Sequence, residues 1–178
     1  MTALTDIKRG AVLSHEDPPI YRYRLDRSWD LTRPVMIWIM LNPSTADHER
    51  DDLTIHACMD FARRNGCGGI TVVNLFAFRS ASPRTMYAAK DPVGRKNDAF
   101  LRKVLVDDAG EGDIVVAGWG AHGERPDRES EERRLIQDWG VKLRCFGRTK
   151  DGHPKHPQAR GAHRIPRDAP LLPYGMEA

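Results

Sequence analysis

The sequence has few of the residues that build cross-linked, metal-centred or membrane-embedded proteins. It contains only three cysteines, Cys58, Cys67 and Cys145, and no CxxC pair. This number and spacing exclude a disulfide framework and a four-thiolate iron–sulfur cluster. No apolar run approaches the roughly 20 residues that a membrane-spanning helix needs, and the first residues lack a signal-peptide pattern. We therefore expect a cytoplasmic protein with no membrane partner.

Aromatic content and net charge are also low. Aromatic residues make up 7% of the chain, and the formal net charge is +3. A hydrophobic content of 40% in 178 residues suffices for one core. We expect a single domain over residues 1–178, with a core at about 20–160 and an irregular, basic tail at about 161–178.

Positive charge is concentrated in the last quarter of the chain, where histidines are interspersed. The residues are Lys142, Arg144, Arg148, Lys150, Lys155, Arg160, Arg164 and Arg167, with His153, His156 and His163. Such a cluster can bind phosphates. A solvated surface is the commoner interpretation of a charge run, so composition alone does not assign a nucleic-acid partner.

Strand and helix patterns alternate along the chain. Four apolar runs predict buried strands at residues 35–40, 69–78, 113–120 and 141–147. Helical spacing lies between them at 52–64, 99–105 and 129–139. A period-two pattern at 21–27 and a turn at 30–34 predict an N-terminal hairpin. Strands separated by helices favour an α/β fold, here a three-layer α/β/α arrangement with a central, mainly parallel four-stranded sheet.

Polar residues follow each of the four predicted strands. Because the carboxyl ends of parallel strands meet at one edge, we expect these side chains to converge there. They are Asn42, Ser44 and Asp47 after the first strand, Asn74 and Arg79 in or after the second, Trp119 and His122 after the third, and Lys150, His153, Lys155 and His156 after the fourth. The sequence therefore predicts a ligand site at this edge.

The segment after the first strand is the most informative of these. Pro43 disfavours helix at the residue before it, so the amide of Asn42 is held in extended chain. Ser44, Thr45 or Asp47 can cap a following helix, whose free N–H groups and positive dipole end suit an anion. A capped turn without a ligand explains this segment equally well.

Asn74 interrupts the apolar second strand. A buried amide without partners costs about 1–3 kcal/mol, so something must contact it. A ligand can supply those contacts, and so can a neighbouring loop.

Several blocks together resemble a known family. They are Tyr21–Leu25, Met40–Asp47, Asn74–Arg79, Gly118–Gly120 with His122-Gly123, and Gly147–Gly152 with Pro154–Pro157. In this order they are similar to the bacterial and phage family called domain of unknown function 1643, over about residues 20–160. That name implies no activity.

A more distant resemblance is to the uracil-DNA glycosylase superfamily. Asn42-Pro43 is similar to its Gly-x-Asn-Pro-Gly motif, Asn74 with Arg79 to its second-strand motif, and His156-Pro157 to its His-Pro-Ser motif. The resemblance implies a uracil-DNA glycosylase-like fold. It also implies hydrolysis of the N-glycosidic bond of a uracil, mismatched or modified base in nucleic acid.

The same resemblance implies residue roles. Asn42 would orient the attacking water while Pro43 fixes the loop, and an amide orients more than it deprotonates. Asn74 would read a flipped base, with Phe76 or Trp119 stacked on it. His156, or else His153, would donate a hydrogen bond to the departing base. Lys155, Arg79 and Arg148 would neutralise the flanking phosphates.

Two departures from the glycosylase motifs keep other functions open. Ser44 stands where the motif has glycine, and Gln158 where it has serine. The alternatives are a non-catalytic nucleic-acid or nucleotide-binding module, and a hydrolase or transferase acting on a free nucleoside or nucleotide.

No cofactor or metal is expected. The two histidines of the His153-x-x-His156 pair are each followed by proline and lack the helical HExxH frame. Neither a Walker phosphate loop nor a Gly-x-Gly-x-x-Gly element follows the first strand. The resemblance to the glycosylases implies a DNA or nucleotide ligand.

Overall fold

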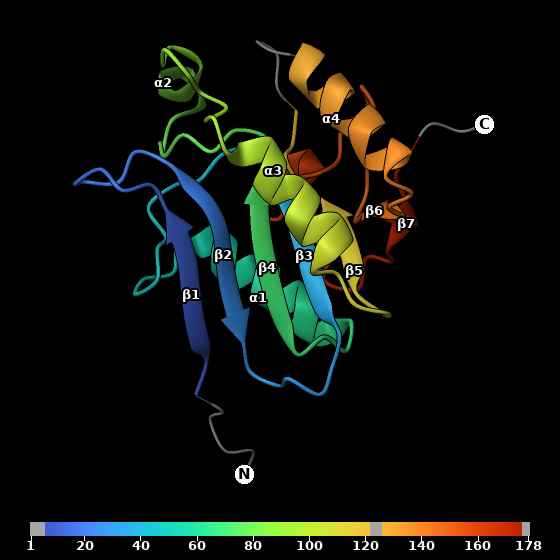
Figure 1. Ribbon diagram of the computed structural model, residues 1–178. Helices are drawn as coiled ribbons and strands as arrows, with labels where there is room; N and C mark the ends of the chain where they lie inside the picture. The colour runs from blue at the N-terminus through green and yellow to red at the C-terminus, as the bar shows by residue number, and fades with distance from the viewer. Residues whose placement is uncertain (1–5, 122–125, 176–178) are drawn as a thin grey trace.

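A seven-stranded mixed sheet forms the centre of the computed structural model, which describes residues 6–121 and 126–175 (Figure 1). The strands in chain order are β1 (Lys8–Leu13), β2 (Arg22–Ser28), β3 (Val35–Met40), β4 (Gly69–Asn74), β5 (Ile114–Ala117), β6 (Leu143–Cys145) and β7 (Leu172–Pro173). Their order across the sheet is β1-β2-β4-β3-β5-β6-β7. The α-helices are α1 (Leu53–Arg64), α2 (Pro83–Tyr87), α3 (Asn97–Arg102) and α4 (Pro126–Asp138). A π-helical turn, Lys103–Asp107, extends α3, and a 3-10 turn spans Gly161–His163.

The predicted α/β class is confirmed, but the predicted sheet is wrong in size and composition. Strand β3 pairs in parallel with β4 and β5, and β5 pairs in parallel with β6. Antiparallel strands flank this centre, because β2 pairs with β4 and with β1 on one side and β7 pairs with β6 on the other. The sheet is therefore mixed, and wider than the expected four strands.

The N-terminal hairpin joins different strands from those expected. Strand β2 forms a hairpin with β1, and its other neighbour is β4 rather than β3. Both edges of β3 are occupied by parallel partners, so the turn after β2 has to pass the end of β4 before β3 begins. The backbone N–H groups of Trp29 and Asp30 accordingly donate to the carbonyl of Gly68, each at 2.9 Å.

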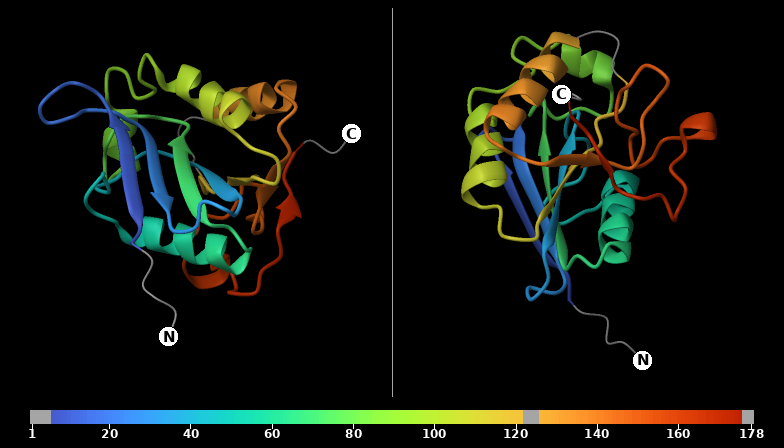
Figure 2. Two further views of the ribbon diagram at one scale, coloured as in Figure 1. Left: turned by 60° about the horizontal axis from the view of Figure 1, so that its bottom comes forward. Right: turned by 90° about the vertical axis from the view of Figure 1, so that its right-hand side faces the viewer.

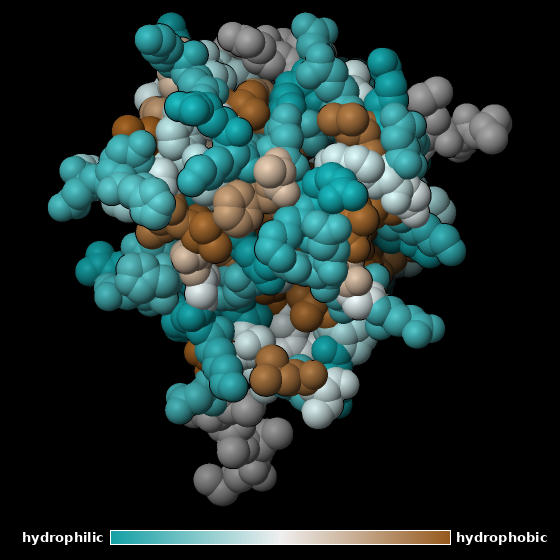
Figure 3. Space-filling view, viewed as in Figure 1, coloured by the Kyte–Doolittle hydropathy of each residue, from teal (hydrophilic) through white to brown (hydrophobic). Residues whose placement is uncertain are grey.

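Helices cover both faces of the sheet, and alternate side chains of β3 pack into the cores on opposite faces. Ile37 and Ile39 belong to the core with α3 and α4, whereas Met36, Trp38 and Met40 belong to the core with α1. Figure 2 shows α1 and the C-terminal segment on one side of the sheet and α3 and α4 on the other. The face that carries α3 is mostly hydrophilic, with scattered apolar residues (Figure 3).

The N-cap of helix α1 is not one of the residues predicted to cap it. Asp52 accepts a hydrogen bond from the backbone N–H of Ile55 at 2.9 Å, so Asp52 is the N-cap. The expected cap Asp47 instead accepts from the N–H groups of Glu49 and Arg50 and closes a turn. Five further residues separate Asp47 from the helix, and this loop is bound to β2, because Arg27 donates to the carbonyls of Asp47 and Arg50. The helix ends at Arg64 with Asn65 as its C-cap, as the Asn-Gly signal predicts.

The C-terminal segment is less irregular than expected. It contributes β7 to the sheet edge, and Ile165 is buried in the core on the α1 side. Across residues 6–121 and 126–175, no helix combines the length and the apolar character needed to cross a membrane. No group of three or more metal-ligating side chains occurs in the same described ranges.

Candidate functional site

A cavity of about 270 Å³ lies at the carboxyl ends of β3 and β4, between the sheet and the amino end of α1. Five of the predicted site residues line it: Asn42, Ser44, Asn74, Trp119 and His156. They come from four segments of the chain. The convergence follows from the parallel β4-β3-β5 arrangement, which brings the ends of the three strands to one edge.

The side chain of Asn42 is held in one orientation. Its amide nitrogen donates to the carbonyl oxygens of Ser80, at 2.8 Å, and of Pro43, at 3.0 Å, with a longer bond to that of Phe78 at 3.4 Å. These acceptors fix which end of the amide is nitrogen. The Oδ1 atom of Asn42 is therefore the end that remains to accept a hydrogen bond from water or a ligand.

Asn74 is fully buried and lines the cavity. Neither its Oδ1 nor its Nδ2 has a hydrogen-bond partner among the described residues. Its backbone is held firmly, because Nδ2 of the buried Asn97 donates to the carbonyls of Asn74, at 2.9 Å, and Leu75, at 3.1 Å. The Nδ2 donor and the Oδ1 acceptor of Asn74 thus lie side by side at the cavity wall. Together they can bind a ligand that presents an acceptor next to a donor, as an amide does.

His156 and Trp119 complete the predicted part of the wall. The backbone N–H of Gln158 donates to Nδ1 of His156 at 3.0 Å. In the neutral ring the proton is then on Nε2, which makes Nε2 a donor. Trp119 is fully buried and packs edge-on against Tyr174, with 5.6 Å between ring centroids.

Four polar residues of the cavity wall were not predicted from the sequence: Arg22, Asp52, Thr54 and Ser80. Asp52 and Thr54 belong to the amino end of α1, and a correct choice of cap would have found them. Arg22 gave no signal, because an arginine in a period-two strand indicates a solvent-facing position. In the structure Arg22 is only 3% exposed.

Phe76, Asp47 and Arg79 do not line the cavity. Phe76 is buried in the core on the α3 and α4 side and packs edge-on against Tyr87, so of the two aromatic residues expected to stack on a ligand it is Trp119 that lines this cavity. Arg79 donates to the carbonyl of Pro19, at 3.4 Å. Pro43 is buried behind the loop, where its carbonyl accepts from the N–H of Ser80 at 2.8 Å.

The predicted basic residues after β6 also lie outside the cavity wall. Arg148 donates to the carbonyl of Pro173 at 3.1 Å and lies over the ring of Tyr174, so it holds β7 against the sheet. Lys150 is exposed in a turn, and the N–H of Lys155 bonds to Gly147. His122 lies outside the described residues.

His153, which is partly buried, contacts a carboxylate that no sequence pattern indicated. Its Nδ1 lies 2.8 Å from Oε2 of Glu129, and the hydroxyl of Tyr174 donates to Oε1 of Glu129 at 3.2 Å. Burial, together with the charge of Glu129, raises the pKa of Tyr174 far above its usual value. These contacts tie α4 to the segment after β6, behind Trp119.

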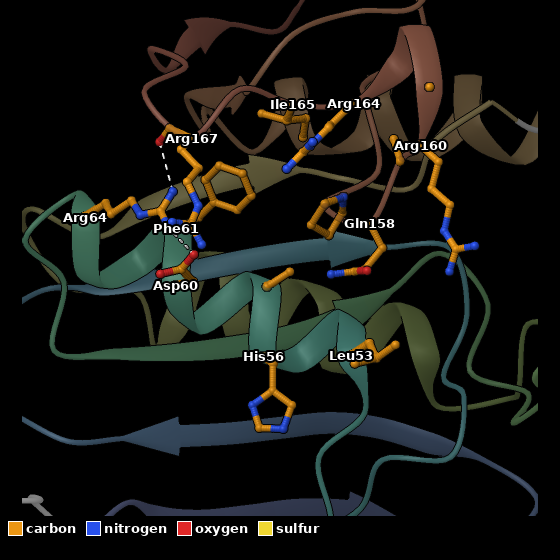
Figure 4. Close-up of a pocket in the computed structure, with 14 residues that line it drawn as sticks. Leu53, His56, Asp60, Phe61, Arg64, Gln158, Arg160, Arg164, Ile165 and Arg167 are labelled. Atoms are coloured by element: carbon orange, nitrogen blue, oxygen red, sulfur yellow. Dashed lines mark hydrogen bonds and ion pairs between the residues drawn. The ribbon is translucent and has the colours of Figure 1, made fainter.

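A second hollow, an open groove of about 670 Å³, runs between α1 and the C-terminal segment (Figure 4). Its cations are Arg64, Arg160, Arg164 and Arg167, and Arg64 bonds to Asp60 and to the carbonyl of Arg167. We call it the arginine groove. Its wall includes Leu53 and residues 157–158, which directly adjoin the cavity residues Asp52, Thr54 and His156 in the chain.

The buried carboxyl of Glu132 on α4 predicts a measurable pH dependence of stability. Burial raises its pKa from 4.5 to about 7, although Arg128, 2.7 Å away, acts to lower it. The folded protein therefore holds this proton over a range where the unfolded chain releases it. We expect the unfolding free energy to fall, by at most about 3 kcal/mol, as pH rises from 4.5 through 7.

Urea unfolding just above pH 4.5 and again above pH 7 measures this effect. Glu132→Gln is the control, because it has no proton to lose and should flatten the dependence. The same pH dependence in both proteins would contradict the assignment to Glu132.

The fold and the cavity define an α/β protein with a small polar cavity at the carboxyl edge of its parallel strands. The chain belongs to the family described as protein of unknown function (DUF1643), whose sequence profile matches residues 22–158. The predicted family is thus confirmed. No curated protein and no solved structure matches the chain. The likeness to uracil-DNA glycosylases rests on the motifs alone.

Proposed function

We propose that this protein hydrolyses the N-glycosidic bond of a uracil, mismatched or modified base in nucleic acid. One observation carries the proposal: Asn42, Asn74 and His156, far apart in the sequence, line one cavity. These are the positions of the three glycosylase-like motifs. Parallel strands bring Asn42 and Asn74 to one edge in any case, so the specific support is that His156, from the segment after β6, lines the same cavity.

The contacts of each residue agree with a hydrolytic role. Oδ1 of Asn42 accepts a hydrogen bond from a water and orients its lone pair toward the anomeric carbon of the sugar. The water oxygen bonds to that carbon as the carbon–nitrogen bond breaks, and the base leaves with the bonding electron pair. Nε2–H of His156 donates a hydrogen bond to the charge that develops on the base. The water loses its proton to solvent.

The size of the cavity supports a single base as the bound unit. Pockets for drug-sized ligands are typically about 300–1,000 Å³, and this cavity is about 270 Å³. A base flipped out of a strand would fit with its reading edge against Asn74, while sugar and phosphate stay outside. Trp119 supplies an aromatic wall.

An abasic-site assay tests the proposal. Single- and double-stranded oligonucleotides carry uracil, mismatched thymine or a modified pyrimidine, and wild type is compared with His156→Ala. We expect wild type to form abasic sites on at least one substrate, and His156→Ala to do so far more slowly. Equal product from both proteins, or none from wild type on the whole panel, would reject the glycosylase.

The arginine groove supports a second candidate, a nucleic-acid-binding module that does not hydrolyse its ligand. Four arginines and one aspartate, Asp60, line the groove, so it carries a net positive charge. Salt-sensitive binding of oligonucleotides without base release would favour this candidate. Base release from free nucleosides or nucleotides, and not from oligonucleotides, would instead favour an enzyme of small-molecule metabolism.

A further inference from the structure

Two arginines of β2 are buried, and they differ in what compensates their charge. Arg27 is fully buried, and its Nε bonds to Asp51 at 2.7 Å. Its remaining nitrogens donate to backbone carbonyls, including those of Asp26 and Asp47. A buried cation with a carboxylate and several carbonyl acceptors is a structural element. Arg27 therefore needs no ligand.

Arg22 lacks such compensation. It is 3% exposed, its Nη1 donates to the carbonyl of Ala46, and its Nε has no partner among the described residues. Within residues 6–121 and 126–175, no carboxylate oxygen lies within 4.0 Å of its guanidinium. Burial lowers the pKa of Arg22 to about 10, so it stays charged at neutral pH. An unpaired buried charge is strongly unfavourable, and an anionic ligand that supplied the counter-charge would offset that cost.

The surroundings of Arg22 identify where that ligand lies. Arg22 lines the cavity together with Asn74, and β2 runs antiparallel beside β4, with Leu25 opposite Val72. This register brings Arg22 to the end of β4 that carries Asn74. Asn74 also lacks hydrogen-bond partners, since neither atom of its buried amide has one among the described residues. Two adjacent unpaired groups thus face one small space.

The amino end of α1 adds to the positive potential of the cavity. Asp52 and Thr54, at the start of this helix of 12 residues, line the same wall. The helix macrodipole places partial positive charge at that end. Asp52 contributes a negative charge nearby, but its Oδ1 caps the helix, and its attraction only partly offsets the burial that lowers the pKa of Arg22.

We infer that the cavity binds an anionic oxygen group, with Arg22 as its counter-charge and Asn74 as its second contact. The inference rests on the proposed function for the nature of the ligand, which is a nucleobase or nucleotide. Two sources have this chemistry: the phosphate of a mononucleotide, and the carbonyl edge of an acidic pyrimidine that leaves with the bonding electrons. In the second case Arg22 is a further catalytic residue that stabilises the leaving base.

Stability measurements separate this role from a structural one. Arg22→Met removes an uncompensated buried charge, so the melting temperature of the free protein should change little. Arg27→Met, the matched control on the same strand, leaves Asp51 with Arg9 alone and removes the donor to four backbone carbonyls, so it should melt far earlier. Arg22→Gln is a second neutral variant that keeps an amide donor for the carbonyl of Ala46.

Calorimetric titration tests the binding itself. The probes are inorganic phosphate, 2′-deoxyuridine 5′-monophosphate, 2′-deoxyuridine and uracil, and the proteins are wild type, Arg22→Met and Arg22→Gln. We expect wild type to bind an anionic probe about tenfold or more tightly than either variant, which corresponds to the loss of one hydrogen bond to a charged group. Tighter binding of the monophosphate than of the nucleoside would identify a phosphate. Uracil binding that strengthens with rising pH would identify the acidic base.

Two outcomes would overturn the inference: no probe binds wild type, or both variants bind the probes as wild type does. A different result would reject the proposed function and keep this inference: wild type binds an anionic probe in an Arg22-dependent way, but releases no base from any oligonucleotide of the panel.

Discussion

Asn42→Ala is expected to slow base release by about 10²–10³-fold while leaving the folded state intact. The amide of Asn42 contributes in two ways: its nitrogen fixes the loop through the carbonyls of Pro43 and Ser80, and its oxygen orients water. Alanine removes both. The loss should fall mainly on kcat, because an oriented water matters in the transition state more than in substrate binding. Single-turnover kinetics on the preferred oligonucleotide measures it.

Asn42→Asp is the informative companion variant. A carboxylate is a better base than an amide, but it would place negative charge against the same carbonyl oxygens that now accept from Nδ2. We therefore expect Asn42→Asp to be less stable than Asn42→Ala and to recover little activity. Full activity in Asn42→Asp would show that residue 42 acts as a base, and an active Asn42→Ala would remove it from the mechanism.

The predicted residues that line the cavity at the strand ends are there for one physical reason. Asn42, Asn74 and Trp119 lie at or just after the carboxyl ends of strands in one parallel group, and parallel strands end at one edge whatever their loops do. A buried apolar strand can be predicted from the sequence, and so can the identity of the side chains at its carboxyl end. Asn74 was identifiable as a buried polar position because it interrupts such a run.

Arg22 could not be found in the same way. Its burial depends on the loop after β3, whose Ala46 carbonyl accepts from Nη1 of Arg22. That interaction joins residues 24 positions apart and leaves no periodic trace. The strand pattern around Arg22 is that of a half-exposed strand, and only the tertiary packing of the loop makes the position buried.

The edges of the sheet were missed for a related reason. Strand β7 has two residues and contains a proline, and β1 lies at the opposite edge with several exposed positions. Edge strands bury too little to show an apolar run, so pairing rather than composition defines them. The contact of His153 with Glu129 likewise joins residues far apart in the chain.

The triple variant Arg160→Gln, Arg164→Gln and Arg167→Gln is expected to weaken oligonucleotide binding by about 100-fold at low salt. These arginines line the open groove that adjoins the cavity through the start of α1 and residues 156–158. Figure 4 shows Arg160, Arg164 and Arg167 beside α1 in this groove. If a flipped base occupies the cavity, the phosphates of its strand would cross the groove. Removing one arginine–phosphate interaction should lower the salt slope by about one.

A matched control removes three arginines from the other face of the sheet. Arg95, Arg102 and Arg134 are exposed on or beside α3 and α4, so their replacement by glutamine changes the net charge equally. Fluorescence anisotropy over a series of salt concentrations compares the two triple variants with wild type. If the phosphates follow the groove, only the groove variant shows a weaker affinity and a smaller slope, because the phosphates touch only that face. An equal decrease in affinity in both variants would show that net charge explains the effect and that the phosphates do not bind in the groove.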